Sequence, residues 1–545
     1  MRTRITILFL FMLISIGVKS QELVKDIIVG GVSSEPCEFT DVNGTIFFEA
    51  GTSENGHELW KSDGTEAGTV MVKDICPGLN DSYPRELTNV NGTLFFSATT
   101  PAGGIELWKS DGTEAGTVIV KAINPSQGSY GGSYPTELVN VNGVLFFLAT
   151  HNSMESKQLW KSDGTETGTV MVKYVQYSEP RNLFEMNGIL YFTSQTNSGG
   201  RDLWKTDGTE AGTVMVKDIC NKTDRQWNSY PFFTNVNGVL YFIPVKDRNN
   251  PLGAELWKSD GTEQGTVFVA NIRVGESNYN EFVTALNGVL YFRAKDDIHG
   301  EELWRSDGTL QGTIMVKDIN PGIESSYPTS CIELKDNLYF EANNGVNGFE
   351  LYKSDGTESG TNLVKDIFIG TESGNPQGFL VFNNMLYFSA YNNYRYKNWK
   401  TDGTSLGTVE QPNDDLNYRS LTVNGSGEKN ETRGYIIANS TLYYSAVSGS
   451  YAGELWKFGG ENLGTTDFEN SQFSIYPNPT TSKLNLQFPN DKIVNKVVII
   501  DVTGKIVLQQ NQNTTQINVE KLSAGVYIIK AYLGNEKFTS KFVKK

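Results

Sequence analysis

An internal repeat constrains this chain of 545 residues more than any other feature of its sequence. The string Glu-Leu-Trp-Lys-Ser-Asp-Gly-Thr-Glu-Ala-Gly-Thr runs from Glu58 to Thr69 and recurs unchanged from Glu106 to Thr117. A ninth, shorter copy keeps Glu-Leu-Trp-Lys at 454–457 but has Gly459 where the other copies have aspartate. The aspartates of the eight full copies are 44 to 53 residues apart, and they are Asp63, Asp111, Asp163, Asp207, Asp260, Asp307, Asp355 and Asp402.

Each copy predicts four short β-strands. In the copy at 85–123 we expect strands at 86–90, 93–98, 105–110 and 117–123, and we find no sustained helical periodicity in the chain. Asn91-Gly92 separates the first two strands, because a type I′ hairpin turn needs two residues with positive φ. Four antiparallel strands at this spacing are typical of a β-propeller blade. Residues 21–466 are therefore predicted to form an all-β propeller of about nine four-stranded blades, or alternatively eight.

The two ends of the repeat region predict how the ring closes. Residues 23–27 match the outer strand of a repeat, as at 316–319, although no complete repeat precedes them. The ninth copy stops at Thr466 without such a strand. We expect the N-terminal strand to complete the last blade, which would remove an exposed strand edge.

The repeated aspartates have two interpretations. A row of carboxylates could bind calcium, but the Asp-x-Asp-x-Asp-Gly spacing of an EF-hand is missing from the sequence. Aspartate also bonds to its own backbone in turns, and glycine takes the left-handed position. The pattern resembles the Asp-box hairpins of other propellers, and we interpret the eight aspartates as structural turn residues with no metal or other cofactor.

Residues 1–20 have the pattern of an export signal. Arg2 and Arg4 precede an apolar run that is too short to cross a membrane comfortably, and cleavage after Ser20 is expected. The rest of the chain has no apolar run long enough for a transmembrane helix. The net charge of −16 argues against nucleic acid and anionic lipid as partners. The sequence predicts a secreted or cell-surface protein that passes through the periplasm.

The last seventy residues differ from the repeats. After a polar linker at 467–472, six short strands are expected at 483–488, 496–501, 506–510, 515–519, 525–533 and 537–543. Short strands at this density predict a small Ig-like β-sandwich at 473–545.

Four motifs of this segment resemble the C-terminal sorting domain of the type IX secretion system, which serves the Bacteroidetes phylum. The resemblance implies export across the outer membrane, with the type IX machinery and a surface sortase as partners. The motifs lie at 476–479, 501–505, 522–527 and 541–544. The residues taken as the sorting signal are Tyr476, Pro477, Asn478, Pro479, Gly504, Lys505, Gly525, Tyr527, Lys541 and Lys544.

The repeats themselves resemble the ELWxxDGT family of exported bacterial proteins, sometimes called hyalin-like, and this resemblance implies no activity. The sequence contains three histidines and has no Gly-x-Ser-x-Gly, HExxH or phosphate-loop motif, so we name no catalytic residue. The favoured function is binding or adhesion at the cell surface, with a glycan or a protein as ligand. A secreted carbohydrate-active hydrolase or lyase and a purely structural surface component remain as alternatives.

The four cysteines are Cys37, Cys76, Cys220 and Cys331. They form no Cys-x-x-Cys pair, which argues against zinc and iron–sulfur sites. Cys76 and Cys220 occupy equivalent positions in distant repeats, whereas Cys37 and Cys76 flank one repeat. A disulfide between Cys37 and Cys76 is therefore the pairing that we test against the structure.

Overall fold

The protein is described by a computed structural model in which every regular element is a β-strand. The chain forms two compact units, Met1–Gly459 and Gly460–Lys545. None of the described segments is a helix long and apolar enough to cross a membrane. The predicted export signal and the predicted linker at 467–472 lie outside the described residues, which are 22–30, 32–102, 104–124, 131–151, 156–174, 179–195, 201–219, 233–244, 255–272, 283–392, 395–411, 434–448, 451–459, 474–487, 496–501, 506–510, 515–533 and 536–545.

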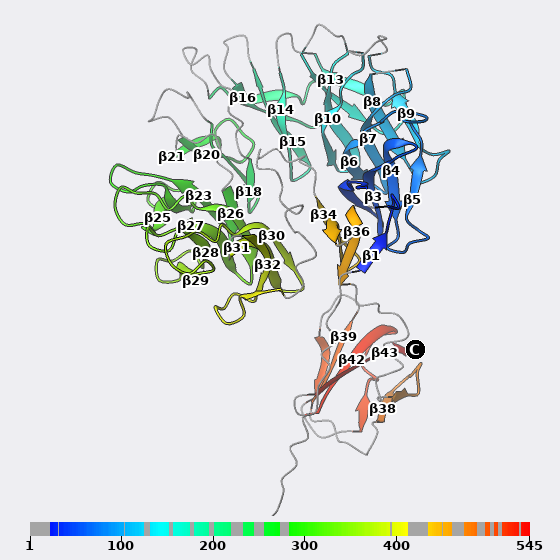
Figure 1. Ribbon diagram of the computed structural model, residues 1–545, viewed down its shortest axis with the longest axis vertical. Helices are drawn as coiled ribbons and strands as arrows, with labels where there is room; N and C mark the ends of the chain where they lie inside the picture. Colours follow the sequence, from blue (N-terminus) through cyan, green and yellow to red (C-terminus); the bar gives the residue numbers. More distant parts are fainter. Residues whose placement is uncertain are drawn as a thin grey trace, which may run out of the picture. The chain divides into compact units, whose positions relative to one another are not determined.

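Nine four-stranded antiparallel sheets make up the described part of the first unit, and in eight of them the strands lie in chain order. We number the sheets 1 to 9 from the inner strand outward (Figure 1). Sheet 1 is β2 (Cys37–Val42), β3 (Thr45–Thr52), β4 (Gly56–Ser62) and β5 (Val70–Lys73); sheet 2 is β6 (Arg85–Val90), β7 (Thr93–Thr99), β8 (Ile105–Ser110) and β9 (Val118–Lys121); sheet 3 is β10 (Thr136–Val141), β11 (Val144–Ala149), β12 (Gln158–Ser162) and β13 (Val170–Lys173). Sheet 4 is β14 (Arg181–Met186), β15 (Ile189–Gln195), β16 (Arg201–Thr206) and β17 (Val214–Lys217); sheet 5 is β18 (Thr234–Val236), β19 (Val239–Phe242), β20 (Glu255–Ser259) and β21 (Val267–Asn271); sheet 6 is β22 (Val283–Leu286), β23 (Val289–Ala294), β24 (Glu302–Ser306) and β25 (Ile314–Lys317). Sheet 7 is β26 (Thr329–Leu334), β27 (Asn337–Asn343), β28 (Phe349–Ser354) and β29 (Asn362–Lys365); sheet 8 is β30 (Gln377–Phe382), β31 (Met385–Asn392), β32 (Arg395–Thr401) and β33 (Val409–Glu410); sheet 9 is β34 (Tyr435–Ala438), β35 (Thr441–Ser448), β36 (Tyr451–Gly459) and β1 (Glu22–Lys25).

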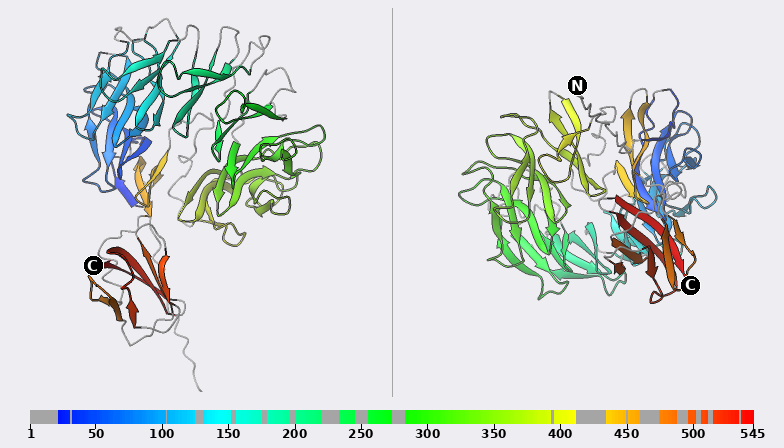
Figure 2. Two further views of the ribbon diagram at one scale, coloured as in Figure 1. Left: turned by 180° about the vertical axis from the view of Figure 1, so that it is seen from behind. Right: turned by 90° about the horizontal axis from the view of Figure 1, so that it is seen from below.

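Sheet 9 shows that the predicted closure is correct at the level of strand pairing. The N-terminal strand β1 pairs antiparallel with β36, in a register that joins Leu23 to Trp456 and Lys25 to Leu455. Figure 2 shows the first strand, in blue, beside the orange strands from the end of the repeat region. Strands that are more than 400 residues apart in the sequence therefore complete one sheet.

Buried side chains fill the space between neighbouring sheets. In sheet 2 the second strand has Leu94 and Phe96 against sheet 1, while Phe95 lies against sheet 3. This follows from the two-residue period of a strand, since both faces of the sheet are covered. Such a cluster lies between each pair of consecutive sheets in the described residues, and another joins sheet 9 to sheet 1 through residues such as Val24 and Phe48. The packing is consistent with a propeller-like arrangement.

The connections divide between two faces of this arrangement. In a sheet whose strands follow in order, the first and third connections lie at one end and the second lies at the other end with the link to the next sheet. The first connection has two residues in all nine sheets, and the third has seven residues in each of sheets 1 to 8. The second varies from 2 to 12 residues, and the link to the next inner strand varies from 7 to 24. We call the two ends the turn face and the variable face.

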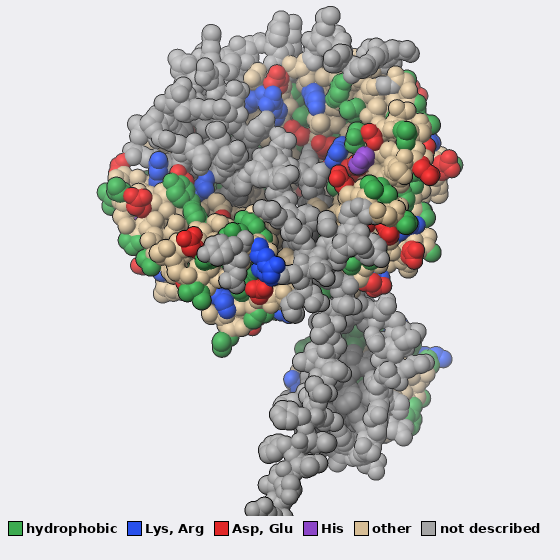
Figure 3. Space-filling model, viewed as in Figure 1, with side chains coloured by type: hydrophobic (Ala, Val, Ile, Leu, Met, Phe, Trp, Pro, Cys, Tyr) green, Lys and Arg blue, Asp and Glu red, His purple; other side chains and the backbone are tan. Residues whose placement is uncertain are grey.

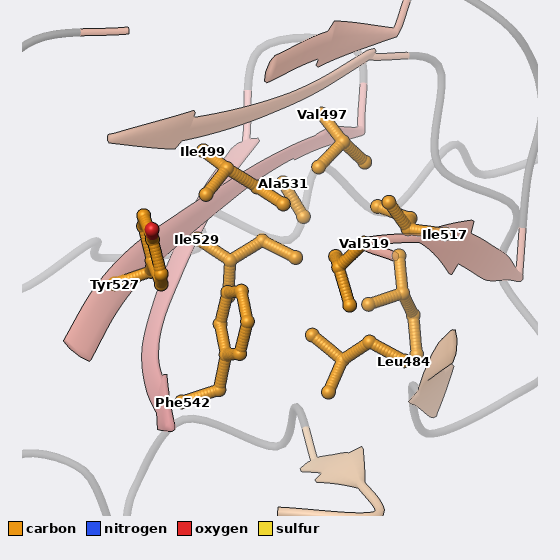
Figure 4. Packing of buried hydrophobic residues seen from close by; sticks show 10 residues of the cluster. Leu484, Val497, Ile499, Ile517, Val519, Tyr527, Ile529, Ala531 and Phe542 are labelled. Atoms are coloured by element: carbon orange, nitrogen blue, oxygen red, sulfur yellow. The ribbon is translucent and has the colours of Figure 1, made fainter. Parts of the chain in front are cut away.

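The second unit has the strands that the sequence predicts, with one more at its start. A three-stranded sheet contains β37 (Ser474–Tyr476), β38 (Lys483–Gln487) and β41 (Gln516–Asn518). A four-stranded sheet contains β40 (Ile506–Gln510), β39 (Lys496–Asp501), β42 (Gly525–Leu533) and β43 (Glu536–Lys544). Side chains from both sheets, including Leu484, Ile499 and Phe542, share one core (Figure 4).

The disulfide between Cys37 and Cys76 is wrong. Both thiols are free: the Cys37 Sγ donates to Glu49 Oε2 at 2.8 Å, and the Cys76 Sγ donates to the Thr99 carbonyl at 3.3 Å. Cys37 begins the inner strand of sheet 1, whereas Cys76 follows its outer strand, so a sheet of four strands separates the two residues. Cys331 is also free, and Cys220 lies outside the described residues.

Candidate functional site

The eight repeated aspartates lie on the turn face, each inside its own seven-residue connection. In the first copy, Asp63 Oδ1 accepts hydrogen bonds from the Thr65 backbone N–H at 2.9 Å and the Thr65 hydroxyl at 2.7 Å. The Thr65 Oγ1 in turn accepts from the Gly68 N–H. These hydrogen bonds lower the pKa of Asp63, because they favour its ionised form. The same aspartate–threonine bonds occur in the other seven copies.

Side chains of the preceding sheet hold each of these turns. The Lys61 ammonium of sheet 1 donates to the Gly112 carbonyl of sheet 2 at 2.8 Å, and Lys73 donates to the Thr117 carbonyl at 2.9 Å. Gly112 has φ 87°, and a Cβ on it would lie 3.1 Å from the Phe47 ring, so both its conformation and its surroundings require glycine. Lys457 and Lys25 of sheet 9 bind the turn of sheet 1 in the same way. The repeated polar residues therefore connect sheet to sheet.

Removal of metal ions tests whether the aspartates act as turn residues. No group of three or more His, Cys, Asp or Glu side chains among the described residues is placed to hold a metal ion. We expect a chelator to change the Tm by less than about 1 °C, because no stabilisation by a bound ion is lost. Differential scanning calorimetry with EDTA measures this, with Asp111→Asn as a matched variant that keeps an acceptor oxygen and removes the charge. A large drop in Tm that calcium reverses would contradict the interpretation.

A buried glutamate in the repeat string organises the variable face, and the sequence analysis assigned it no role. Glu302 Oε2 accepts from the Ile319 N–H at 2.9 Å and the Ser326 hydroxyl at 2.5 Å, while Oε1 accepts from the Ser326 N–H at 3.0 Å. The carboxylate thus holds the connection that leads to sheet 7. Burial outweighs these donors and raises the pKa of Glu302 to about 7. Equivalent carboxylates with a raised pKa are Glu58, Glu106, Glu350 and Glu454.

This raised pKa predicts a pH dependence of stability. Near pH 4 and below, the Glu302 carboxyl is neutral in both folded and unfolded chains; between 4.5 and about 7 only the unfolded chain ionises. Stability is therefore lost as the pH rises through this window, by up to ~3 kcal/mol for a shift of this size. Glu302→Gln stays neutral, so its Tm should fall less than that of the wild type between pH 5 and pH 8. Sheet 3 has Gln158 at this position, so Gln158→Glu should add pH dependence; equal losses of Tm in all three proteins would contradict the prediction.

The variable face between sheets 1 and 2 carries a group of polar side chains that other repeats lack. Glu49 is 2% exposed, and its carboxylate lies 2.7 Å from His57 Nδ1 and 3.3 Å from Arg85 Nη1. Arg85 also lies 3.5 Å from Glu38, and its guanidinium is over the Tyr83 ring, which stacks with His57. Figure 3 shows acidic, basic and histidine side chains together on one face of the molecule.

The chemistry of this group favours recognition over catalysis. Both oxygens of Glu49 are engaged, by His57 on one side and by Cys37 and Arg85 on the other. Burial raises the pKa of Glu38 to about 7 and also raises the pKa of the Cys37 thiol, so Cys37 is not a nucleophile at neutral pH. The carboxylates are too enclosed to reach a substrate. The exposed parts of the group belong to His57, Tyr83 and Arg85, which present rings and a guanidinium to the solvent.

The sorting-signal residues come together in the second unit, although they lie at both ends of it in the sequence. Asn478 donates through Nδ2 to the Lys541 carbonyl at 3.1 Å and accepts from the Val543 N–H at 2.9 Å. Tyr527 stacks on Phe542, with ring centroids 5.6 Å apart. Lys541 is exposed and Lys544 is buried; Tyr476 begins the 476–479 motif at the end of β37, with Pro477 and Pro479 following, and Gly525 begins β42. Gly504 and Lys505 lie outside the described residues.

Residues 474–545 match the family model described as the secretion system C-terminal sorting domain. The matched segment covers almost the whole second unit, including the 476–479 motif and the terminal strand that Asn478 binds. The second unit is a type IX secretion sorting domain, and the chain is exported to the cell surface or secreted.

None of the curated proteins compared with the chain matches it. Solved structures similar to it include the computationally designed Ika8 protein, with 12% identity and a TM-score of 0.36 over 70% of this chain and 99% of that one. Another is PorZ, a surface component of the type IX secretion system of Porphyromonas gingivalis, with 12% identity and a TM-score of 0.32 over 93% of this chain and 75% of that one. These TM-scores are too low to support an argument about fold or function.

Proposed function

We propose that the first unit is a nine-bladed β-propeller that binds a ligand at the cell surface or outside the cell through its variable face. The contrast between the two faces carries this proposal. Every turn on the turn face has the same length from sheet to sheet, whereas the variable face changes in length and in chemistry. Strongly exposed aliphatic side chains also concentrate on the variable face, at Val29, Leu79, Ile323 and Ile369.

The sorting domain supplies the other half of the function. We propose that the type IX machinery recognises residues 474–545 as a delivery signal and that a surface sortase then removes them. The contacts that join Asn478 to Lys541 and Val543 support this role, because they bring the motifs at the two ends of the domain into one recognisable surface. Whether the propeller then stays on the cell or is released does not change its role as a binding protein.

A binding assay on the purified full-length protein tests the role of the variable face. The protein is applied to an array of soluble polysaccharides and extracellular proteins, and sugar release is followed in parallel. One variant carries four changes on the variable face: Leu79→Ser, Tyr83→Ala, Tyr327→Ala and Ile369→Ser. A matched variant changes four exposed residues on the turn face: Glu66→Ser, Glu114→Ser, Leu310→Ser and Leu406→Ser.

We expect the variable-face variant to lose most of the binding and the turn-face variant to keep it. A ligand that binds both variants as well as the wild type, or a wild type that binds nothing, would contradict the proposed function and favour a purely structural surface component. Release of sugar by the wild type would favour the carbohydrate-active enzyme instead.

A further inference from the structure

The repeats provide an internal comparison for every aromatic residue. A phenylalanine recurs in the second strand of most sheets, as at Phe48 and Phe388, and is buried between sheets. Sheets 7 and 8 carry further rings on the variable face. Phe349 and Tyr396 stand where sheets 1 and 2 have His57 and Ile105. The repeat does not require these rings for its core, so they need another explanation.

Two more rings of this region depart from the repeat pattern in the same way. Tyr391 stands where sheet 1 has Gly51, and Phe368 follows the outer strand of sheet 7 where Cys76 follows that of sheet 1. Tyr327, in the link that leads into sheet 7, is 44% exposed. We call these five residues the aromatic strip, and they are Tyr327, Phe349, Phe368, Tyr391 and Tyr396.

The rings of the aromatic strip lie next to one another. Phe368 and Tyr391 are nearly parallel, with centroids 6.0 Å apart and an angle of 11° between their planes. Tyr391 meets Tyr396 at 5.3 Å, and Tyr327 meets Phe349 at 6.5 Å. The link between sheets 7 and 8 connects the two groups, because the Asn375 N–H donates to the Phe349 carbonyl while the next residue, Gly374, accepts from the Tyr391 N–H.

Amides rather than charges surround the aromatic strip. The loop at 343–349 contains asparagine, glycine, valine and phenylalanine and has no charged residue. Asn344 Oδ1 accepts from the backbone N–H groups of Val346 and Asn347, which fixes the loop. Asn347 donates to Asp366 at 2.9 Å, so the carboxylate closest to the loop is already paired. The surroundings of the strip suit a ligand with hydroxyl groups and no net charge.

We propose that the aromatic strip binds an uncharged polysaccharide. This inference rests on the proposed function and names the ligand class. The C–H face of a pyranose ring packs against an aromatic ring, while its hydroxyls exchange hydrogen bonds with amides and with tyrosine O–H groups. A chain of such rings matches a row of neighbouring aromatics better than a compact ligand does. The net charge of −16 disfavours an anionic polysaccharide.

Affinity electrophoresis of the full-length protein tests this proposal with named probes. The uncharged probes are a soluble mixed-linkage β-glucan, a glucomannan and a dextran, and the anionic probes are alginate and polygalacturonate. The variants are Tyr391→Ala and Tyr396→Ala, with Tyr391→Phe to keep the ring. Tyr83→Ala is the matched control, because Tyr83 is exposed to a similar degree on the same face at sheet 1.

We expect at least one uncharged probe to retard the wild type, and each alanine variant to bind it about tenfold more weakly. Tyr391→Phe and Tyr83→Ala should bind within about twofold of the wild type. The Tm of each variant is measured alongside: a lower Tm with unchanged binding would show that the rings only stabilise the junction and would overturn the proposal. Retention by the anionic probes alone, or equal losses from Tyr83→Ala and Tyr391→Ala, would overturn it while leaving the variable face as a binding surface.

Discussion

Deletion of residues 21–27 is expected to destabilise the whole first unit. The deletion removes β1, so β36 loses its pairing partner along Leu23 and Lys25. It also removes the buried side chain of Val24 and the Ile27 N–H that donates to Glu454 Oε2 at 2.9 Å. Loss of several apolar side chains and hydrogen bonds should cost on the order of 5 kcal/mol. We expect the Tm to fall by at least about 5 °C.

The exposed edge of β36 gives this deletion a second signature. An unpaired strand can pair with another chain, so the deleted protein should self-associate, which size-exclusion chromatography detects. Glu22→Ala is the control, since this residue lies on β1 but its side chain is largely exposed and contacts Lys457 alone among the described residues. An unchanged Tm together with a monomeric elution profile would show that β1 does not close the ring.

Truncation after residue 472 is expected to keep the protein inside the cell. The truncated chain lacks the whole sorting domain, and we expect its amount at the surface and in the medium to fall at least about tenfold, with folded protein accumulating in the periplasm. Cell fractionation and protease accessibility of intact cells measure the distribution, and circular dichroism of the purified truncated protein reports on its folding.

Two point changes make the same test without removing the domain. Asn478→Ala breaks both bonds to the terminal strand, and replacement of residues 541–545 removes the other half of that contact; each should reduce surface export. Lys521→Ala, an exposed change in the same domain outside these contacts, should leave export normal. Normal amounts of the truncated protein at the surface would refute the delivery role. An unfolded truncated protein would instead show that the second unit stabilises the repeats.

Local chemistry explains why much of the architecture can be predicted from the sequence. The two-residue period of the strands and the need for positive φ at Asn91 and Gly92 act within one repeat, and the structure has strands within two residues of the expected positions in the copy at 85–123. Because the pattern recurs, one copy predicts the others, and residues 23–27 can be matched to the outer strand that the ninth copy lacks. The strands of the sorting domain are equally local.

The candidate binding surface depends on contacts that the sequence does not reveal. Cys37 and Cys76 flank one repeat in the sequence, yet the width of a sheet separates them. The pairing of Glu49 with Arg85 joins neighbouring sheets, and the same is true of the stacking between Phe368 and Tyr391. Neither pair follows from the repeat, because both use positions where the copies differ.

The sequence by itself determined the repeat, its turns, the strand that closes the last sheet and the export domain, because each depends on patterns within a short segment or on likeness between copies. Only the tertiary structure decided which face of the sheets varies, how Glu302 holds the link between sheets 6 and 7, and which rings gather beside Tyr391. Those features arise when side chains from different strands and sheets meet, and their burial and distances are set by the packing of the complete unit.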